Sequence, residues 1–130
     1  MTRHARAELL LDTDRVSAGL GTRAVAIAPR QLVFRHGPHQ LEVLAPESRA
    51  PGAARFVWGQ LLSGVESPCA DTGIAWLDGA GTVCSETTTD EFGEFRLAAP
   101  AEEGGLRVSA EPECFICWVP PARSDARSDA

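Results

Sequence analysis

The chain has 130 residues, of which 44% are hydrophobic and 23% are charged, and its formal net charge is −6. This composition is typical of a single globular domain and excludes wholesale disorder. The negative charge argues against a nucleic acid or an anionic membrane as partner, because both are bound through an excess of positive charge.

No segment of the sequence is suited to export or to membrane insertion. The first apolar run, Leu9 to Leu11, is followed at once by Asp12, whereas a secretory signal needs a longer apolar core. No run approaches the ~20 apolar residues of a membrane helix. We therefore expect a cytoplasmic protein that inserts into no membrane and keeps its thiols reduced.

The chain divides into three parts. Residues 1–30 lack a sustained period and predict an N-terminal extension that is partly ordered or packs on the main domain. Within it, "AELLLD" favours a short strand or a helical turn, and "AVAIAP" favours a weak edge strand. Residues 31–120 form the domain proper. Residues 121–130 repeat RSDA and have nothing large to bury, which predicts a disordered tail.

Eight short apolar runs, separated by turn residues, follow one another between residues 31 and 120 at intervals of roughly 8–12 residues. In chain order the expected strands are 32–34, 41–43, 55–63, 74–78, 82–89, 94–99, 106–112 and 114–120. This spacing predicts an all-β fold, an antiparallel Greek-key β-sandwich of about seven to eight strands. The residues expected on its inner face are Phe34, Val57, Leu61, Ile74, Leu77, Phe95, Leu97, Leu106 and Val108.

The stretch "TTTDEFGEFRL" predicts a structural turn between two strands. Asp90 can accept backbone N–H groups two residues on, and Gly93 supplies the positive φ that closes such a loop. Thr89 and Phe95 lie on the flanking strands. A calcium loop is the alternative, but it needs alternating oxygen donors, and this turn offers two adjacent carboxylates only.

Residues 55–111 resemble the carboxypeptidase regulatory-like domain. Val57, Gly59 and Leu61 match its V-x-G-x-V strand, and Ile74, Trp76 and Asp78 match the strand that follows. The signature T-D-x-x-G-x-F-x-[FL] is matched by Thr89, Asp90, Gly93, Phe95 and Leu97. The P-P-G-x-Y corner that follows in the family is replaced here by "PAEEGGLRV". The resemblance implies a β-sandwich of the prealbumin (transthyretin-like) type.

The segment "RQLVFRHGPHQLEVL" resembles a subgroup found in bacterial genes near extracytoplasmic-function sigma factors and their regulators. Members of this kind are non-catalytic, so the resemblance implies no active-site residues and no cofactor. It implies a module that acts through protein–protein interaction, in a sigma-factor-linked regulatory or envelope-response system.

The "CFIC" segment, Cys114 to Cys117, has the C-x-x-C spacing of redox and zinc sites. Its neighbours predict a strand, which would place the two Cα atoms ~10 Å apart, whereas a disulfide tolerates no more than ~7 Å. Zinc would also need further ligands, and Cys69 and Cys84 form no second C-x-x-C. We expect buried reduced thiols; a zinc or redox site and a Cys69–Cys84 disulfide are the alternatives.

No enzyme site emerges from the other polar residues. His36 and His39 flank a Gly-Pro turn without a third ligand nearby, so exposed turn residues are expected rather than a metal site. The nucleophile elbow G-x-S-x-G is absent, and "GLGTRA" lacks the lysine of a phosphate-binding loop. We expect no catalysis and no cofactor.

Aromatic residues give the one indication of a binding surface. Phe56, Trp58 and Leu62 share the strand face opposite the expected core, and the "CFICWV" strand, with Phe115 and Trp118, is apolar on both faces. A sandwich strand needs only one apolar face, so either another segment covers the surplus or a partner does.

Two functions follow from these observations. The first is an adaptor that presents an aromatic face or an edge strand to another protein. The second is a carbohydrate-binding module that stacks sugar rings on exposed tryptophans, for which the candidates are Trp58, Trp76 and Trp118. The exposure of the three indole rings separates the two readings.

Overall fold

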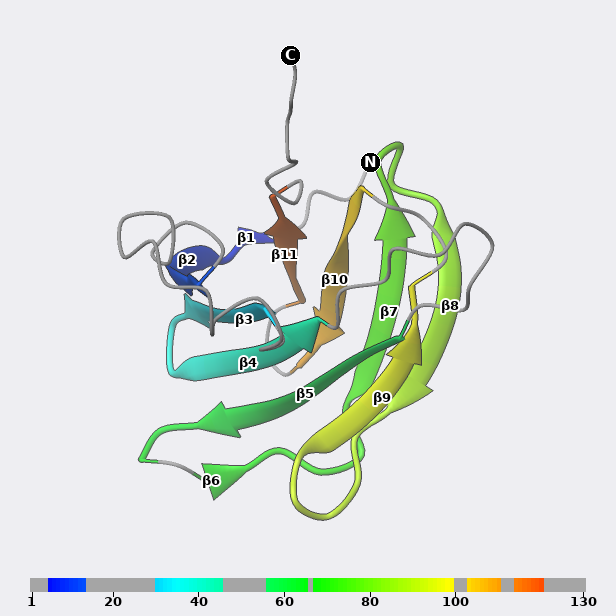
Figure 1. Cartoon of the computed structure of the whole chain (residues 1–130). Coiled ribbons are helices and arrows are strands. Elements are labelled where there is room, and N and C mark those ends of the chain that lie inside the picture. Colours follow the sequence, from blue (N-terminus) through cyan, green and yellow to red (C-terminus); the bar gives the residue numbers. More distant parts are fainter. Residues whose placement is uncertain are drawn as a thin grey trace.

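Two β-sheets face each other in the computed structural model, which describes residues 5–13, 30–45, 56–65, 67–99, 103–110 and 114–120. These residues contain eleven strands, and the expected all-β sandwich is confirmed (Figure 1). All eight strands expected between residues 31 and 120 are present. The three additional strands lie in the N-terminal segment and in the loop after residue 63.

Sheet A has five strands in the spatial order β1–β11–β10–β7–β8. Its neighbours are antiparallel except for the first pair, β1 and β11, which is parallel. Its strands are β1 (Ala5–Arg6), β7 (Gly73–Asp78), β8 (Val83–Thr88), β10 (Gly104–Ser109) and β11 (Phe115–Val119).

Sheet B has six strands, of which β2, β3, β4 and β5 lie side by side in that order. The far edge of β5 is shared by β9 along its first half and by β6 at its end. The strands are β2 (Glu8–Asp12), β3 (Arg30–His36), β4 (His39–Ala45), β5 (Phe56–Ser63), β6 (Ser67–Pro68) and β9 (Glu94–Ala98). In Figure 1, β3 and β4 run across the direction of β10 and β7 behind them. Sandwiches of this kind use bent strands that pass between sheets at the corners.

The N-terminal strand passes from one sheet to the other. β1 pairs with β11 in sheet A, the N–H of Ala7 donates to the carbonyl of Ile116 (2.9 Å), and β2 then pairs with β3 in sheet B. A bulge between Leu9 and Leu11 turns the strand further. "AELLLD" is thus a strand rather than a helical turn, whereas "AVAIAP" and the tail 121–130 lie outside the described residues.

An ion pair fastens this strand to its neighbours. The Arg30 guanidinium donates to both carboxylate oxygens of Asp12, at 2.9 and 2.7 Å, and to the carbonyl of Pro120 at 3.1 Å. Asp12 is buried, and its side chain is only 2% exposed. The ion pair ties β2 to β3, and the bond to Pro120 ties Arg30 to the residue after β11. Removing either partner of the pair would leave a buried charge, which is destabilising.

The core lies between the sheets and is built by the alternation of side chains along each strand. All nine residues expected on the inner face are buried. Leu77 is a partial exception, because it alternates with the core residue Trp76 and lies on the outer side of sheet A. The core comprises Leu32, Phe34, Leu41, Val43, Val57, Leu61, Ile74, Trp76, Phe95, Leu97, Ala99, Leu106, Val108, Ala110, Phe115 and Cys117.

The predicted turn between β8 and β9 forms as expected and carries the chain from sheet A to sheet B. The Asp90 carboxylate accepts the N–H groups of Phe92 and Glu94, both at 2.9 Å. Gly93 has φ of 76° and its carbonyl accepts the N–H of Leu61 at 2.8 Å. A Cβ at this glycine would collide with the carbonyl oxygen of Leu61, so no other residue fits.

Thr89 fastens this turn to the loop before β7. Its hydroxyl donates to the carbonyl of Cys69 (2.6 Å) and accepts the N–H of Thr72 (2.9 Å), and the side chain is 3% exposed. Its backbone N–H also donates to the Thr72 carbonyl at 2.9 Å. A buried hydroxyl therefore satisfies two backbone groups that have no strand partner.

The turn between β7 and β8 repeats the same geometry. The Asp78 carboxylate accepts the N–H groups of Ala80 and Thr82, both at 2.9 Å, and Gly81 has φ of 89°. Both turns therefore follow the pattern D-x-x-G-x, with the aspartate oxygen bonded two and four residues ahead. Both connections of β8 depend on this one motif.

Strand β10 begins two residues earlier than the sequence predicts, at Gly104 rather than Leu106. Gly105 pairs with Leu77 on one side and with Trp118 on the other, and a Cβ there would lie 2.8 Å from the Trp118 ring. The two glycines allow this close approach and have no side chain by which the strand is detected in the sequence.

Replacing Thr89 by valine is expected to lower the free energy of unfolding by about 2–4 kcal/mol, because the Cys69 carbonyl and the Thr72 N–H both lose a buried partner. Thr88→Val, one residue earlier on the exposed side of β8, is the matched control and should cost under about 0.5 kcal/mol. Urea unfolding measures both. Equal costs for the two variants would contradict the role of the hydroxyl.

The two glycines Gly93 and Gly37 separate backbone strain from collision. Gly93→Ala places a methyl group against the Leu61 carbonyl and should cost about 3 kcal/mol or more. Gly37 has φ of 59°, and a Cβ there would have nothing within 4 Å. Gly37→Ala should therefore lower the free energy of unfolding by about 1–2 kcal/mol, the cost of the left-handed conformation alone. Thermal or urea unfolding compares the two variants. A larger loss of stability for Gly37→Ala than for Gly93→Ala would contradict the role of the collision.

Candidate interaction surface

Three of the five residues predicted for a partner surface lie on the outer face of β5. Trp58 is 41% exposed, and Phe56 and Leu62 are half-buried. They alternate with Val57 and Leu61, which point into the core. β5 has a neighbour on both edges, so its outer face is held by backbone pairing on either side. The three residues share one face of β5, with Phe56 and Trp58 at its start and Leu62 near its end.

The other two predicted residues do not join this surface. Phe115 is 1% exposed and belongs to the core, so its assignment to a partner surface is wrong. The reason is that β11 points Phe115 and Cys117 inward. Trp118 is half-buried on the outer side of sheet A, where it packs over Gly105. The two apolar faces of "CFICWV" are thus covered, one by the core and the other in part by the strand's own sheet.

Trp76 does not contribute to any surface either. The ring is 3% exposed, and among the described residues its indole N–H is buried without a hydrogen-bond partner. Stacking of a sugar ring on Trp76 is therefore excluded in the folded chain. Of the three tryptophans, Trp58 has the most accessible ring.

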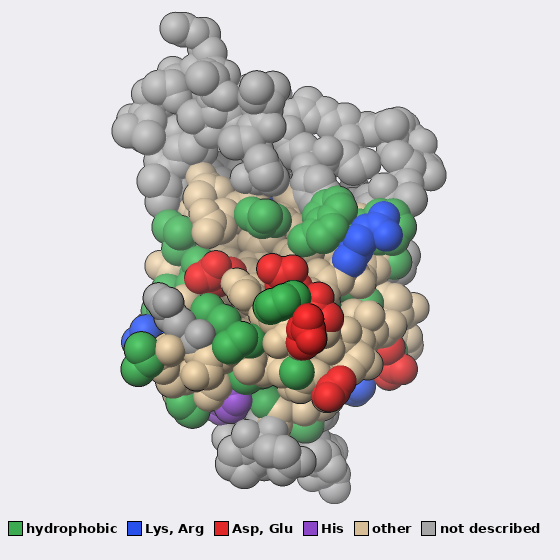
Figure 2. Space-filling model, turned by 90° about the horizontal axis from the view of Figure 1, so that it is seen from below, with side chains coloured by type: hydrophobic (Ala, Val, Ile, Leu, Met, Phe, Trp, Pro, Cys, Tyr) green, Lys and Arg blue, Asp and Glu red, His purple; other side chains and the backbone are tan. Residues whose placement is uncertain are grey.

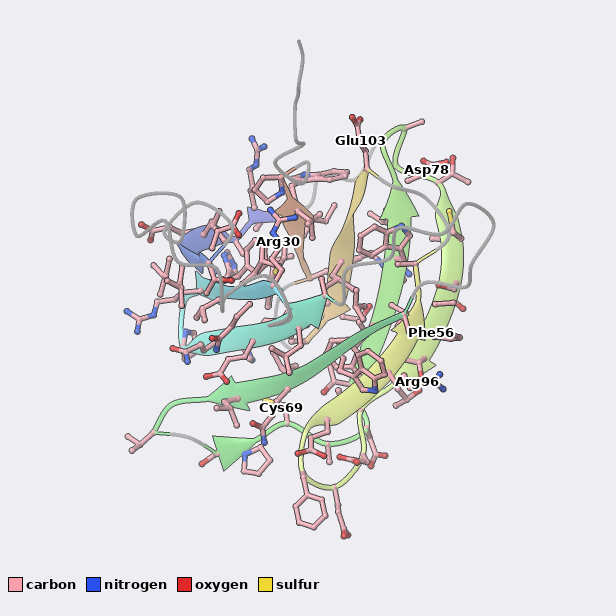
Figure 3. The ribbon with its side chains drawn as sticks, in the orientation of Figure 1. Arg30, Phe56, Cys69, Asp78, Arg96 and Glu103 are labelled. Atoms are coloured by element: carbon pink, nitrogen blue, oxygen red, sulfur yellow. The ribbon has the colours of Figure 1, made fainter. Side chains whose placement is uncertain are left out.

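Two residues beside Trp58 complete this surface and were not singled out from the sequence. Leu44 is 42% exposed and pairs with Trp58 across β4 and β5, and Arg96 pairs with it across β5 and β9. The Arg96 guanidinium carbon lies 3.9 Å from the centre of the Phe56 ring and 5.6 Å from that of Trp58. Figure 3 shows Arg96 next to Phe56 at the start of β5. The guanidinium lies over both rings, and these cation–π contacts hold it in place.

The neighbouring row of the sheet is polar. Glu42, Gln60 and Glu94 pair across β4, β5 and β9 on the same outer face. Gln60 donates to the carbonyl of Phe92 (3.0 Å), and Gln40 donates to Glu42 (3.1 Å). Seen from below in Figure 2, acidic side chains gather in the middle of the molecule with hydrophobic ones around them. The acidic–aromatic face is defined here as Leu44, Phe56, Trp58, Arg96, Glu42, Gln60 and Glu94.

A shallow groove lies on the outer side of sheet A, with a volume of about 410 Å³. Arg107 and Glu86, which form an ion pair at 3.6 Å, belong to its lining. The other lining residues are Gly73, Ile74, Ala75, Thr87, Thr88 and Ser109. Neither histidine nor cysteine lines the groove, so the nucleophile–base pairs that use those residues are not assembled there.

The four cysteines are free thiols in different environments. Cys84 is exposed, Cys69 and Cys114 are half-buried, and Cys117 is buried in the core. Burial raises the pKa of the Cys117 thiol well above its usual range, and it raises the pKa of Cys69 as well. Cys117 is therefore a protonated, unreactive core residue. Among the described residues no group of three or more potential metal ligands is assembled.

The histidines of the first hairpin differ from the exposed turn residues that the sequence predicts. His39 is 8% exposed and His36 is half-buried, and their rings lie 5.7 and 4.9 Å from that of Phe115. Both continue the inward alternation of Phe34 and Leu41, so only Gly37 and Pro38 form the exposed turn. Burial and the adjacent His36 lower the pKa of His39.

No helix in the described stretches has the length and apolar character needed to span a lipid bilayer. Comparisons with protein families, with characterised proteins and with solved structures found no match to this chain.

His39 makes stability depend on pH. Because its pKa is lowered in the fold, the unfolded chain binds a proton more readily, and stability is lost as pH falls through about 6.5. The free energy of unfolding should therefore decrease between pH 7.5 and 5.5, and His39→Gln should flatten that slope. Urea unfolding at a series of pH values measures both chains. An unchanged slope in the variant would show that another group titrates.

Proposed function

We propose that this chain is a non-catalytic β-sandwich module that binds another protein through the acidic–aromatic face. The observation that carries the proposal is the cross-strand pair Leu44 and Trp58, each more than two-fifths exposed in the middle of a paired sheet. Large apolar side chains side by side on a rigid face mark interaction sites. Tryptophan and arginine are also the residues on which binding energy concentrates.

The rigidity of the face supports the same reading. Strand pairing holds the backbone of Leu44, Trp58 and Arg96 in one row, and the stacking of Arg96 on Phe56 limits the rotamers of both side chains. Because these side chains are already ordered, little of their conformational entropy is lost when a partner binds. Such a face suits recognition of a protein surface, because its exposed side chains stand side by side on paired strands.

The resemblance of residues 55–111 to the carboxypeptidase regulatory-like domain supports a non-catalytic role. The residues that carry it, Thr89, Asp90, Gly93 and Phe95, all have structural tasks in the turn and the core. The resemblance of the β3–β4 hairpin to the sigma-factor-linked subgroup makes a bacterial regulatory or envelope-response protein the partner to test first.

Carbohydrate binding is the second candidate, and the exposure of the Trp58 ring is the observation that favours it. Glu42 and Gln60 lie within the same face and offer hydrogen-bonding groups. A glycan array distinguishes this function. Binding of a glycan that quenches tryptophan fluorescence in the native chain and not in Trp58→Phe would favour sugar over protein as the ligand.

Selection of a random-peptide phage library against the immobilised chain tests the protein-binding proposal. Clones are expected that bind the native chain and lose at least about tenfold in affinity, or about 1.4 kcal/mol, for Leu44→Ala/Trp58→Ala. The matched control is Val65→Ala/Val83→Ala, which removes two exposed apolar side chains outside the face. Clones that bind all three chains equally, or no clones at all, would overturn the proposal.

A further inference from the structure

The acidic–aromatic face carries two carboxylates that have no cationic partner among the described residues. Glu42 accepts one hydrogen bond from the neutral Gln40, and Glu94 is exposed. Arg96, the cation of the face, lies over the rings of Phe56 and Trp58 and forms no ion pair with either glutamate. The polar row of the face is therefore negatively charged.

The spacing of the two charges follows from the register of the sheet. Glu42 and Glu94 face outward from β4 and β9, with Gln60 of β5 between them in the same row. Two strand spacings place their Cβ atoms about 10 Å apart. This spacing suits two separate cationic side chains, one for each carboxylate.

The row beside them carries two exposed apolar side chains, Leu44 and Trp58, and the cation Arg96, which lies over the rings of Phe56 and Trp58. Leu44 and Trp58 lie next to Glu42 and Gln60 along β4 and β5, one outward position away on each strand. A ligand that covers both rows meets two carboxylates on one side and exposed leucine and tryptophan surface on the other. Its complement combines positive charge with apolar side chains.

We propose that the partner is a protein segment that carries two arginine or lysine side chains about 10 Å apart, next to at least one large apolar side chain. The inference rests on the proposed function and names the partner's chemistry. Burial of an apolar anchor on Trp58 and Leu44 provides affinity, and the two glutamates select basic segments and position them.

Charge also argues against the other occupants of this face. A second copy of the chain that docks through the same face brings two glutamates and one arginine against two glutamates and one arginine, so both surfaces carry an excess of negative charge. The net charge of −6 adds long-range repulsion between copies and from any polyanion. The same charge attracts a basic segment and accelerates its association.

The test uses two synthetic decapeptides, one composed of arginine and leucine and one composed of glutamate and leucine. Backbone amide NMR of the full chain follows the shifts of Trp58, Gln60 and Leu44 as each peptide is added. The arginine peptide is expected to shift these amides and to bind about tenfold more weakly in 300 mM than in 50 mM salt. The glutamate peptide is expected to leave them unchanged.

Two double variants with the same net charge separate the site from bulk electrostatics. Glu42→Gln/Glu94→Gln should weaken binding of the arginine peptide by about three- to tenfold. Glu86→Gln/Glu103→Gln removes two exposed carboxylates outside the face and should change it less than about twofold. Equal losses in the two variants would show attraction to overall charge and overturn the inference.

The outcomes also separate this inference from the proposed function. Phage clones that depend on Trp58 but are not enriched in arginine or lysine would overturn the basic-segment inference and leave protein binding standing. Binding of the glutamate peptide at Trp58, or dimers by light scattering that Trp58→Ala dissolves, would do the same. The absence of any Trp58-dependent clone would remove both.

Discussion

The turn from Thr89 to Gly93 is the constraint on which the rest of the fold depends. It ends β8 in sheet A and starts β9 in sheet B, so it joins the two layers at one corner. Leu61 donates its N–H to the Gly93 carbonyl, and this bond sets the register of β9 on β5. A slip of one residue would exchange Phe95 with Glu94 or Arg96, and the core face would be lost to solvent.

That register also places the residues of the candidate surface. Arg96 reaches the rings of Phe56 and Trp58 because β9 pairs Trp58 with Arg96 and Gln60 with Glu94. The position of Glu94 and Arg96 in the surface therefore depends on the turn that ends at Gly93, directly before β9. The surface is built on paired strands and has the stability of the sandwich rather than the mobility of a loop. The structural turn and the candidate surface are linked through one hydrogen-bonded strand pair, β5 and β9.

The strands, the turn at Asp90 and most of the core follow from the sequence, because alternation and turn chemistry are local. What escapes is set by distant contacts. Pairing of β1 with β11 across more than a hundred residues has no local signal, and Gly104 offers no side chain to reveal a strand. The burial of His39 could have been predicted from the sequence, because His39 lies two residues before Leu41 and so faces inward with it.

The outward apolar side chains on the central strands of the two sheets differ in their exposure. In sheet A the outward residues Ala75 and Leu77 are 2% and 3% exposed. The Arg107–Glu86 pair lies over the first, and Trp118 packs on the strand beside the second. In sheet B the outward pair Leu44 and Trp58 keeps about two-fifths of its surface in water. Because Leu44 and Trp58 stay partly in water, they contribute less to folding than full burial of their apolar area would give. Binding of a partner over these two side chains would recover that free energy, which is the physical basis of the proposed interaction.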